Sequence, residues 1–281
     1  MTITKEDVER AREYSARRFA FRGDDNSEKR RPKNWQGYHH GVIQLPFGGE
    51  IFKNSPLNLR HNPKDKLHPE GVWQPFKSTE ERQTAEEWCD QCGDVVFLRD
   101  CLNSSLALGY NFISEGDSLS RTEIGELEHT AKHNEDMAAI NKITELMTNT
   151  IRDFCPYTKA DLICSVPTHQ GKDFHLPAIL AQNISEQFRM LNITENFSFS
   201  ADKPSLKNTK IEEKWDALAG VEFLTQDNTV TLQGKSIILV DDKYQSGVTL
   251  QFVASRLLEK GASKVFGLCA VKTWRDDDNT S

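Results

Sequence analysis

Two adjacent carboxylates mark the part of this sequence that is best equipped for chemistry. Asp241 and Asp242 follow the strand-like run SIILV, residues 236–240. Two like charges side by side repel, so we expect a cation or a good hydrogen-bond donor close to them. A short polar loop follows, and an amphipathic segment that reads as a helix begins near Thr249. The pair therefore stands where a buried strand ends and a loop leads into a helix.

That loop has the composition of an anion-binding site. The backbone amides of residues 245–248 and the N-terminus of the next helix present N–H groups and the positive end of a helix dipole. Gly247 lets the backbone turn and approach a ligand closely, and Ser246 and Thr249 add hydroxyl donors. The two carboxylates upstream could accept hydrogen bonds from sugar hydroxyls. A phosphorylated ribose matches both halves of this arrangement.

The acidic pair and the loop would be positioned by the edge of a sheet, and the sequence after residue 120 predicts such a sheet. Residues 122–154 carry apolar residues at helical spacing, with a break near Asn134. Strands and helices then alternate: strand 160–167, helix 176–191, strand 236–240, helix 249–261 and strand 264–271. This alternation implies right-handed crossovers and a parallel sheet with helices on its faces. Ligands bind beyond the carboxyl ends of such strands, where the acidic pair and the loop after Pro167 both lie.

The first 119 residues show weaker periodicity. Residues 1–19 read as a charged surface helix with Thr4 and Asp7 at capping-box spacing. Residues 21–36 and 61–75 read as irregular, and residues 41–52 predict a hairpin around Phe47, Gly48 and Gly49. We therefore divide the chain into an N-terminal extension of unknown fold, residues 1–119, and an α/β domain, residues 120–281.

The acidic pair, its loop and the following helix resemble the 5-phosphoribosyl 1-pyrophosphate (PRPP) motif of type I phosphoribosyltransferases. ADLICSVPTHQGKD, residues 160–173, is similar to the strand and pyrophosphate loop of ComF-like members. IGELEHTAKHNED, residues 124–136, resembles their helix that carries a lysine, with Lys132 and His133 in the matching places. GLCAVKTWRD, residues 267–276, resembles their last strand. The resemblance spans residues 120–275 and implies a type I phosphoribosyltransferase-like parallel sheet flanked by helices, with an N-terminal extension.

The resemblance implies a role for each matching position. Asp241 and Asp242 would hold the ribose hydroxyls and bind magnesium, which offsets charge as pyrophosphate leaves. The 5′-phosphate loop would consist of Gln245, Ser246, Gly247, Val248 and Thr249, and the pyrophosphate loop would contain Thr168, His169, Gln170 and Lys172. The family usually has two threonines where Gln245 and Ser246 stand, and its pyrophosphate loop is longer.

Several lysines near this motif are also candidates for a role in binding. Lys243 directly follows the acidic pair, where the family more often has a small apolar residue. We expect it to pair with Asp241 or Asp242, or to reach a phosphate. Lys203, Lys207 and Lys210 fall where the family has a mobile segment, and they either close over pyrophosphate as a lid or form a plain charged loop.

The implied activity is transfer of a phosphoribosyl group from PRPP to a base or another acceptor, which would make the chain a glycosyltransferase. One alternative is a PRPP- or nucleotide-binding regulator without turnover. Another is an effector subunit of a multi-protein assembly, such as a bacterial defence system, with the first 119 residues docking a protein partner. The sequence names neither the acceptor nor the oligomeric state, and a homodimer remains open.

Composition limits the remaining classes of function. The 281 residues carry a net charge of −7 without a basic block, so non-specific nucleic-acid binding is not favoured. No apolar run approaches the ~20 residues of a membrane helix. The N-terminus lacks the apolar core of a secretory signal, and the six cysteines are scattered. These features favour a cytoplasmic protein.

A zinc site is left open by the spacing of three cysteines. Cys89, Cys92 and Cys101 form a C-x2-C-x8-C pattern, which lacks a fourth ligand. Candidates for that ligand are His39, His40, His61 and His68. His129 and His133 are four residues apart on a predicted helix but are expected to face solvent, while Cys155, Cys164 and Cys269 read as core residues.

Overall fold

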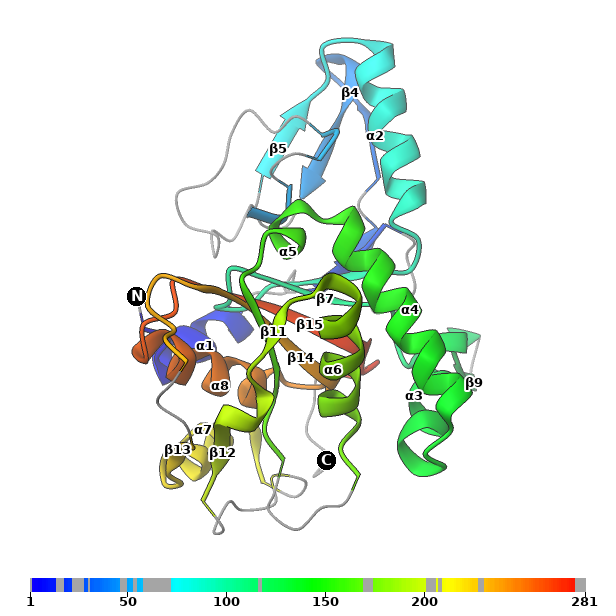
Figure 1. Cartoon of the computed structure of the whole chain (residues 1–281). Helices are drawn as coiled ribbons and strands as arrows, with labels where there is room; N and C mark the ends of the chain where they lie inside the picture. Colours follow the sequence, from blue (N-terminus) through cyan, green and yellow to red (C-terminus); the bar gives the residue numbers. More distant parts are fainter. Residues whose placement is uncertain are drawn as a thin grey trace.

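A mixed α/β fold is present in the computed structural model of the chain (Figure 1). The structure describes residues 2–13, 18–21, 28–29, 31–45, 50–52, 55–57, 72–115, 118–168, 174–200, 206, 209–226 and 230–275. Within these residues, no helix combines the length and the apolar character that a membrane span requires.

An eight-stranded sheet forms the centre of the molecule. Its spatial order is β11 (Leu191–Asn192), β10 (Leu162–Ser165), β14 (Ser236–Tyr244), β15 (Lys264–Lys272), β7 (Ser104–Ala107), β6 (Val96–Leu98), β1 (Arg18–Ala20) and β2 (Glu28–Lys29). Among these eight strands β6 alone runs against the others, because it pairs antiparallel with both β7 and β1. The predicted parallel sheet is confirmed. Since β7 pairs with β15, strands from both sides of residue 120 share this sheet.

Helices cover both faces of the sheet, as a parallel sheet requires. Figure 1 shows α1 (Lys5–Glu13), α7 (Ile211–Ala219) and α8 (Val248–Glu259) on one side, and α3 (Glu123–His133), α4 (Met137–Asp153) and α6 (Leu176–Phe188) on the other. The side chains of β14 alternate between two hydrophobic cores. Ile237 and Leu239 pack with residues of α7 and α8, whereas Ile238 and Val240 pack with residues of α4 and α6. This alternation follows from the two-residue period of a strand.

The predicted break near Asn134 is confirmed and has a clear physical cause. Asn134 is the C-cap of α3, and Glu135 follows with a φ of 54°. Asp136 then caps α4 by accepting a hydrogen bond from the Ala139 amide at 2.9 Å. The N-terminal capping box is also confirmed, since the Asp7 amide donates to the Thr4 hydroxyl at 3.2 Å and the Thr4 amide donates to Asp7 Oδ2 at 3.1 Å.

A smaller antiparallel sheet projects from the central one (Figure 1). It contains β3 (Lys33–Trp35), β4 (Tyr38–Leu45) and β5 (Val72–Pro75), and it packs beside α2 (Thr79–Gln91). The turn of the hairpin predicted for residues 41–52 lies outside the described residues, but the two arms do not pair, because β4 pairs with β3 and β5 and residues Glu50–Phe52 form η1. The β3–β4 turn contains Gly37, whose φ is 91°. The interpretation of residues 21–36 and 61–75 as irregular also missed β2, β3 and β5.

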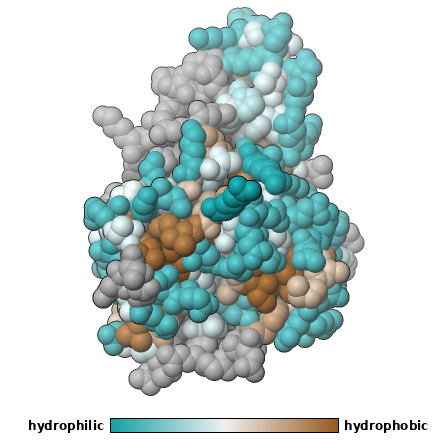
Figure 2. All heavy atoms as spheres, viewed as in Figure 1, coloured by the Kyte–Doolittle hydropathy of each residue, from teal (hydrophilic) through white to brown (hydrophobic). Residues whose placement is uncertain are grey.

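Short elements complete the fold. They are α5 (Cys155–Thr158), the hairpin of β8 (Phe112–Glu115) and β9 (Ser118–Arg121), η2 (Thr194–Asn196), and the pair of β12 (Phe197–Phe199) and β13 (Phe223–Thr225). Figure 2 shows that hydrophilic residues cover most of the face seen in Figure 1, with separate hydrophobic areas below the projecting sheet. Apolar areas of this kind are ordinary on a folded surface.

Candidate functional site

The acidic pair lies within β14 and not beyond its end. β14 pairs with β15 as far as Tyr244, which lies opposite Lys272. The sequence prediction of a strand that ends at Val240 is therefore wrong. The cause is the neighbouring strand, since β15 extends to Lys272 and offers a partner to the polar residues after Val240. The carboxylates stand near the carboxyl end of a central strand, where parallel sheets bind ligands.

The two carboxylates have different surroundings. Asp242 is buried, whereas Asp241 is half-buried and reaches the adjacent pocket. The Asp242 amide donates a hydrogen bond to Asp241 Oδ1 at 2.9 Å. Burial, followed by the neighbouring Asp242 carboxylate, raises the pKa of Asp241 to about 8. Burial also acts to raise the pKa of Asp242, but the charge and hydrogen bond of Lys132, together with the charge of Lys243, lower the net pKa of Asp242.

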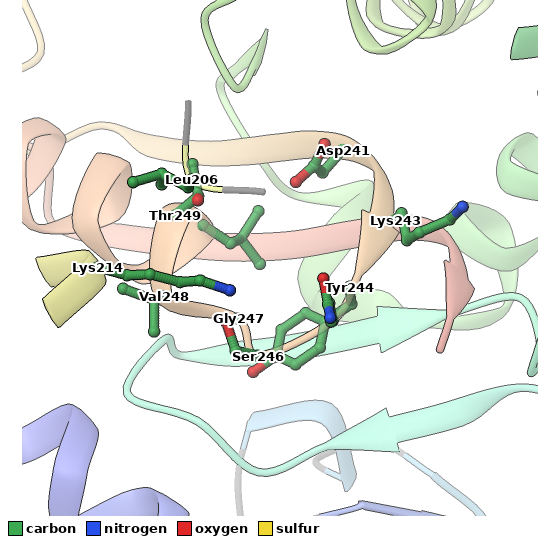
Figure 3. Close-up of a pocket in the computed structure, with 11 residues that line it drawn as sticks. Leu206, Lys214, Asp241, Lys243, Tyr244, Ser246, Gly247, Val248 and Thr249 are labelled. Carbon is green, nitrogen blue, oxygen red and sulfur yellow. The ribbon is translucent and has the colours of Figure 1, made fainter. Parts of the chain in front are cut away.

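Helix α3 supplies the charges that balance the acidic pair. Lys132 forms an ion pair with Asp242 and also lies 4.0 Å from Glu128, one turn earlier on the same helix. Glu128 is 1% exposed, and its Oε1 lies 3.1 Å from Lys243 Nζ. Among the described residues Lys243 thus forms its ion pair with Glu128 and not with Asp241 or Asp242, while its contact with a phosphate stays a prediction. Its side chain points away from the pocket in Figure 3, toward the α3 side of the sheet, where Glu128 lies.

The loop after β14 has the conformation that the sequence predicts. Gly247 has a φ of 73° and precedes the first residue of α8. A Cβ on this glycine would collide with the Tyr244 ring, whose hydroxyl donates to Asp100 Oδ2 at 3.2 Å. Only glycine combines this φ with so close a neighbour. The loop therefore presents its backbone at the N-terminus of α8, where an anion is stabilised.

Cations from two distant elements fix the backbone of this loop. Arg12 of α1 donates to the Ser246 carbonyl at 3.4 Å. Lys272 of β15, which is 1% exposed, donates to the Gln245 carbonyl at 3.3 Å. Because the C=O and N–H of a trans peptide point in opposite directions, these contacts turn the amides of Ser246 and Gly247 away from the two cations. The N-terminal helix thus contributes to the site directly.

A pocket of about 270 Å³ lies between Asp241 and the loop, and Asp242 is not among its described lining residues (Figure 3). The described residues that line it come from β14, the loop, α8, α7 and one residue before α7: Leu206, Lys214, Asp241, Lys243, Tyr244, Gln245, Ser246, Gly247, Val248, Thr249 and Leu250. The structure therefore brings together Asp241 and all five predicted residues of the phosphate loop.

Sequence reasoning missed three charged residues of this site. Lys214 lies on α7 and is 5% exposed, and its ammonium end points into the pocket in Figure 3. Glu128 was missed although it stands four residues before Lys132, a spacing that places both on one helix face. No sequence feature of Lys272 indicated a role in the site, apart from its being a lysine at the end of a strand-like run. Of the predicted lid lysines, Lys210 is described and is exposed, while Lys203 and Lys207 lie outside the described residues.

The predicted pyrophosphate loop is only partly within the described residues. Thr168 is half-buried just after β10, the strand next to β14, and so lies at the same edge of the sheet as the acidic pair. His169, Gln170 and Lys172 lie outside the described residues. Their placement in the site stays a prediction.

Two cysteines of the C-x2-C-x8-C pattern lie in one hydrophobic core, and the third, Cys101, is half-buried against the other core. Cys89 and Cys92 are buried, and burial raises the pKa of Cys89 to about 12 and that of Cys92 further. Among the described residues, no three His, Cys, Asp or Glu side chains are grouped as metal ligands would be. His61 and His68 lie outside the described residues, so the zinc site stays a prediction. His129 and His133 have ring centroids 4.6 Å apart on α3.

Solved phosphoribosyltransferase structures are similar to part of the chain. A hypoxanthine phosphoribosyltransferase from Staphylococcus aureus is 13% identical, with a TM-score of 0.31, over 47% of this chain and 62% of that enzyme. A hypoxanthine-guanine phosphoribosyltransferase from Bacillus anthracis is 20% identical, with a TM-score of 0.32, over 50% of this chain and 70% of that enzyme. The chain thus covers less than two thirds of the Staphylococcus enzyme.

No protein-family model matches the chain, and no curated protein matches it either. At identities below 25% and with these TM-scores, the structural likeness assigns neither an activity nor site residues to this chain.

Proposed function

We propose that the chain binds PRPP with magnesium in the pocket between β14 and α8, as a phosphoribosyltransferase of the type I, ComF-like kind. One observation carries the proposal: a single pocket presents the Asp241 carboxylate beside a glycine loop that leads into a helix N-terminus. Carboxylate oxygens accept hydrogen bonds from sugar hydroxyls, and loop amides donate to a phosphate. A phosphorylated ribose carries hydroxyls for the carboxylate and a phosphate for the loop within one small molecule.

In this proposal each wall of the pocket performs one task. The acidic pair accepts hydrogen bonds from the ribose diol, and the amides of the loop, with the hydroxyls of Ser246 and Thr249, hold the 5′-phosphate. Thr168 and the residues after it would face the pyrophosphate. The bond between the anomeric carbon and pyrophosphate then breaks, and a bond from that carbon to a nucleophilic atom of the acceptor forms.

The donor set fits a magnesium ion that arrives with the ligand. Magnesium prefers oxygen ligands and usually combines one or two carboxylates with substrate phosphates. Asp241 presents a carboxylate to the pocket, and Asp242 lies beside it with Lys132 as its partner. When bound, the ion would neutralise negative charge on the pyrophosphate leaving group.

A titration with PRPP tests the proposal. Changing both Asp241 and Asp242 to Asn keeps their shape but removes the charge-assisted hydrogen bonds, typically worth ~1.5–3 kcal/mol each. The affinity for PRPP with magnesium should therefore fall by at least roughly a hundredfold, while ribose 5-phosphate loses less because the loop is unchanged. Calorimetric titration measures both ligands, and a thermal melt confirms that the variant is folded. Equal PRPP affinities in the two proteins would contradict the proposal.

A second candidate is a PRPP- or nucleotide-binding regulator or effector subunit without turnover. It is favoured by the acidic pair itself, because Lys132 neutralises Asp242 and the pKa of Asp241 is raised, so the pair carries less charge with which to stabilise a cationic transition state. The exposed Trp35 and Trp73, whose ring centroids are 4.4 Å apart on the projecting sheet, would suit a protein partner. Release of pyrophosphate from PRPP with a panel of bases would separate enzyme from binder.

A further inference from the structure

A buried lysine faces the phosphate loop from a helix that sequence reasoning did not assign to the site. Lys214 of α7 is 5% exposed and lines the same pocket as residues 245–250. Figure 3 shows its side chain extending from α7 into the pocket, with the ammonium end directed toward the loop and the start of α8. The side chain therefore crosses from one wall of the pocket toward the other.

The position of Lys214 is fixed by the packing of its helix. Ile211 and Leu218 of α7 are buried in the hydrophobic core that α8 shares. The Trp215 ring meets the Phe252 ring of α8 edge-on, with centroids 5.2 Å apart. Residues 211, 214 and 218 lie on one face of a helix by their spacing. Lys214 thus occupies a core-facing position, where an apolar residue would be expected.

The Lys214 ammonium is a charged hydrogen-bond donor held inside the pocket. A lysine ammonium has three N–H groups and no acceptor, so a phosphate oxygen is a group that it can bind. Its positive charge lies on the side of the pocket where the N-terminus of α8 presents the positive end of the helix dipole.

We propose that Lys214 binds the phosphate of the ligand, so that the pocket selects a dianionic phosphate monoester over a neutral sugar. This rests on the proposed function, since it assigns a second phosphate-binding element to the same pocket. The loop amides and hydroxyls hold the phosphate from the α8 side, and the Lys214 ammonium contacts it from the α7 side. Charge-assisted hydrogen bonds of this kind are stronger than those from neutral donors.

Substitutions on α7 and α8 test the role, with ribose 5-phosphate and ribose as calorimetric probes. Lys214→Met keeps most of the side-chain length and removes the charge, and Lys260→Met makes the same change at the exposed C-cap of α8, at the end of that helix away from the pocket. Ribose 5-phosphate affinity should fall about 10–100-fold in Lys214→Met, the range for one charge-assisted hydrogen bond. It should stay within about twofold of wild type in Lys260→Met and recover in part in Lys214→Arg. Equal losses in the two methionine variants would overturn the role of Lys214.

The pH dependence gives a readout that a structural role would not move. A phosphate monoester gains its second negative charge with a pKa of about 6. Wild-type affinity for ribose 5-phosphate should therefore rise between pH 5 and 7.5, and the rise should be smaller in Lys214→Met. Parallel pH profiles in the two proteins would contradict the proposal.

Failure of this inference is distinguishable from failure of the proposed function. If wild type binds ribose 5-phosphate and folded Lys214→Met binds it equally well, only the role of Lys214 is wrong. If wild type binds neither ribose 5-phosphate nor PRPP, both are wrong. Should Lys214→Met not fold, a crystal structure of wild type with ribose 5-phosphate decides, and a Lys214 ammonium beyond hydrogen-bonding distance of the phosphate would overturn the inference.

Discussion

The two walls of the pocket differ in how their charges are balanced. On the β14 wall, the acidic pair is matched by Lys132 of α3, and Glu128 of the same helix is matched by Lys132 and Lys243. On the loop wall, positive polarity from the α8 N-terminus and Lys214 is directed into the pocket. The acidic wall is thus neutralised from the opposite face of the sheet, whereas the loop wall presents hydrogen-bond donors and the N-terminus of α8 to the pocket.

From this difference we infer which part of a ligand should contribute most to its affinity. A diol needs acceptors of hydrogen bonds, and partly neutralised carboxylates still provide them. A phosphate needs charge and aligned donors, which the loop wall concentrates at one place. We therefore expect changes at the loop to affect binding of every phosphorylated ligand, and changes at the acidic wall to act more on protein stability and on ligands that carry the diol and magnesium.

The largest effect is expected at Gly247. Gly247→Ala would place a Cβ against the Tyr244 ring at a φ of 73° and distort the loop. Affinity for ribose 5-phosphate should fall at least about a hundredfold, the loss expected for two or more charge-assisted hydrogen bonds. Calorimetric titration measures this loss.

Gly234 provides a matched control for this change. It also has a φ of 73°, but a Cβ there meets no atom within 4 Å and it is not among the described pocket residues. Gly234→Ala should lower stability by about 1–2 kcal/mol without changing the affinity. A normal affinity in Gly247→Ala would mean that the loop does not bind the phosphate.

An intermediate effect is expected for the lysines of the acidic wall. Lys132→Met leaves Asp242 buried without its cation, which costs about 3–5 kcal/mol in a fully buried pair. The Lys132 side chain is 31% exposed, so we expect roughly 1–3 kcal/mol of lost unfolding free energy. Lys243→Met should cost about 0–1 kcal/mol, because Lys132 remains near Glu128. Urea unfolding of the two variants measures the difference. Equal losses of unfolding free energy would contradict the account that Lys132 is the main cation balancing the acidic pair.

A smaller effect of opposite sign is expected within the acidic pair. The folded-state pKa of Asp241 is raised to about 8, so its stability contribution is full below the ordinary pKa near 3.8 and is lost as the pH rises toward 8. Asp241→Asn should therefore stabilise the protein at pH 8 and have little effect at pH 3.5.

The pKa of Asp242 is lowered, so its contribution to stability is present above pH 3.8 and is lost as the pH falls. Asp242→Asn should destabilise at neutral pH, and progressively less in acid.

Thermal melts of the two single variants across this pH range check these signs. A change of 1 kcal/mol corresponds to about 2–4 °C for a chain of this size. Melting temperatures that shift in the same direction for both variants at pH 8 would show that the two carboxylates are not differently placed.

The sequence allowed the central strands and helices to be predicted, because each has a clear apolar period. The conformation of the loop before α8 was also predictable, because Gly247 stands between a strand and a helix. The extension of β14 through Asp241 to Tyr244 was not, because charged residues conceal a strand whose existence depends on pairing with β15. β1, β6 and β7 have only three or four residues each, too few to show a period, and their place in the sheet is set by distant partners.

The charged residues were harder to assign than the glycine loop. Lys243 stands beside the acidic pair in sequence, but its ammonium lies 3.1 Å from Glu128 of α3, a helix more than a hundred residues earlier in the chain. Lys214 lies 27 residues before Asp241 in the sequence, and only the packing of α7 on α8 brings it to the pocket. No spacing rule connects residues on elements that meet only in the folded chain.

A crystal structure of the protein with PRPP and magnesium tests the central claim most directly. The account predicts the 5′-phosphate within hydrogen-bonding distance of the backbone amides of residues 246–249, with the ribose hydroxyls at the acidic pair. A ligand bound elsewhere, or a pocket that stays empty at saturating PRPP, would contradict the assignment of this site.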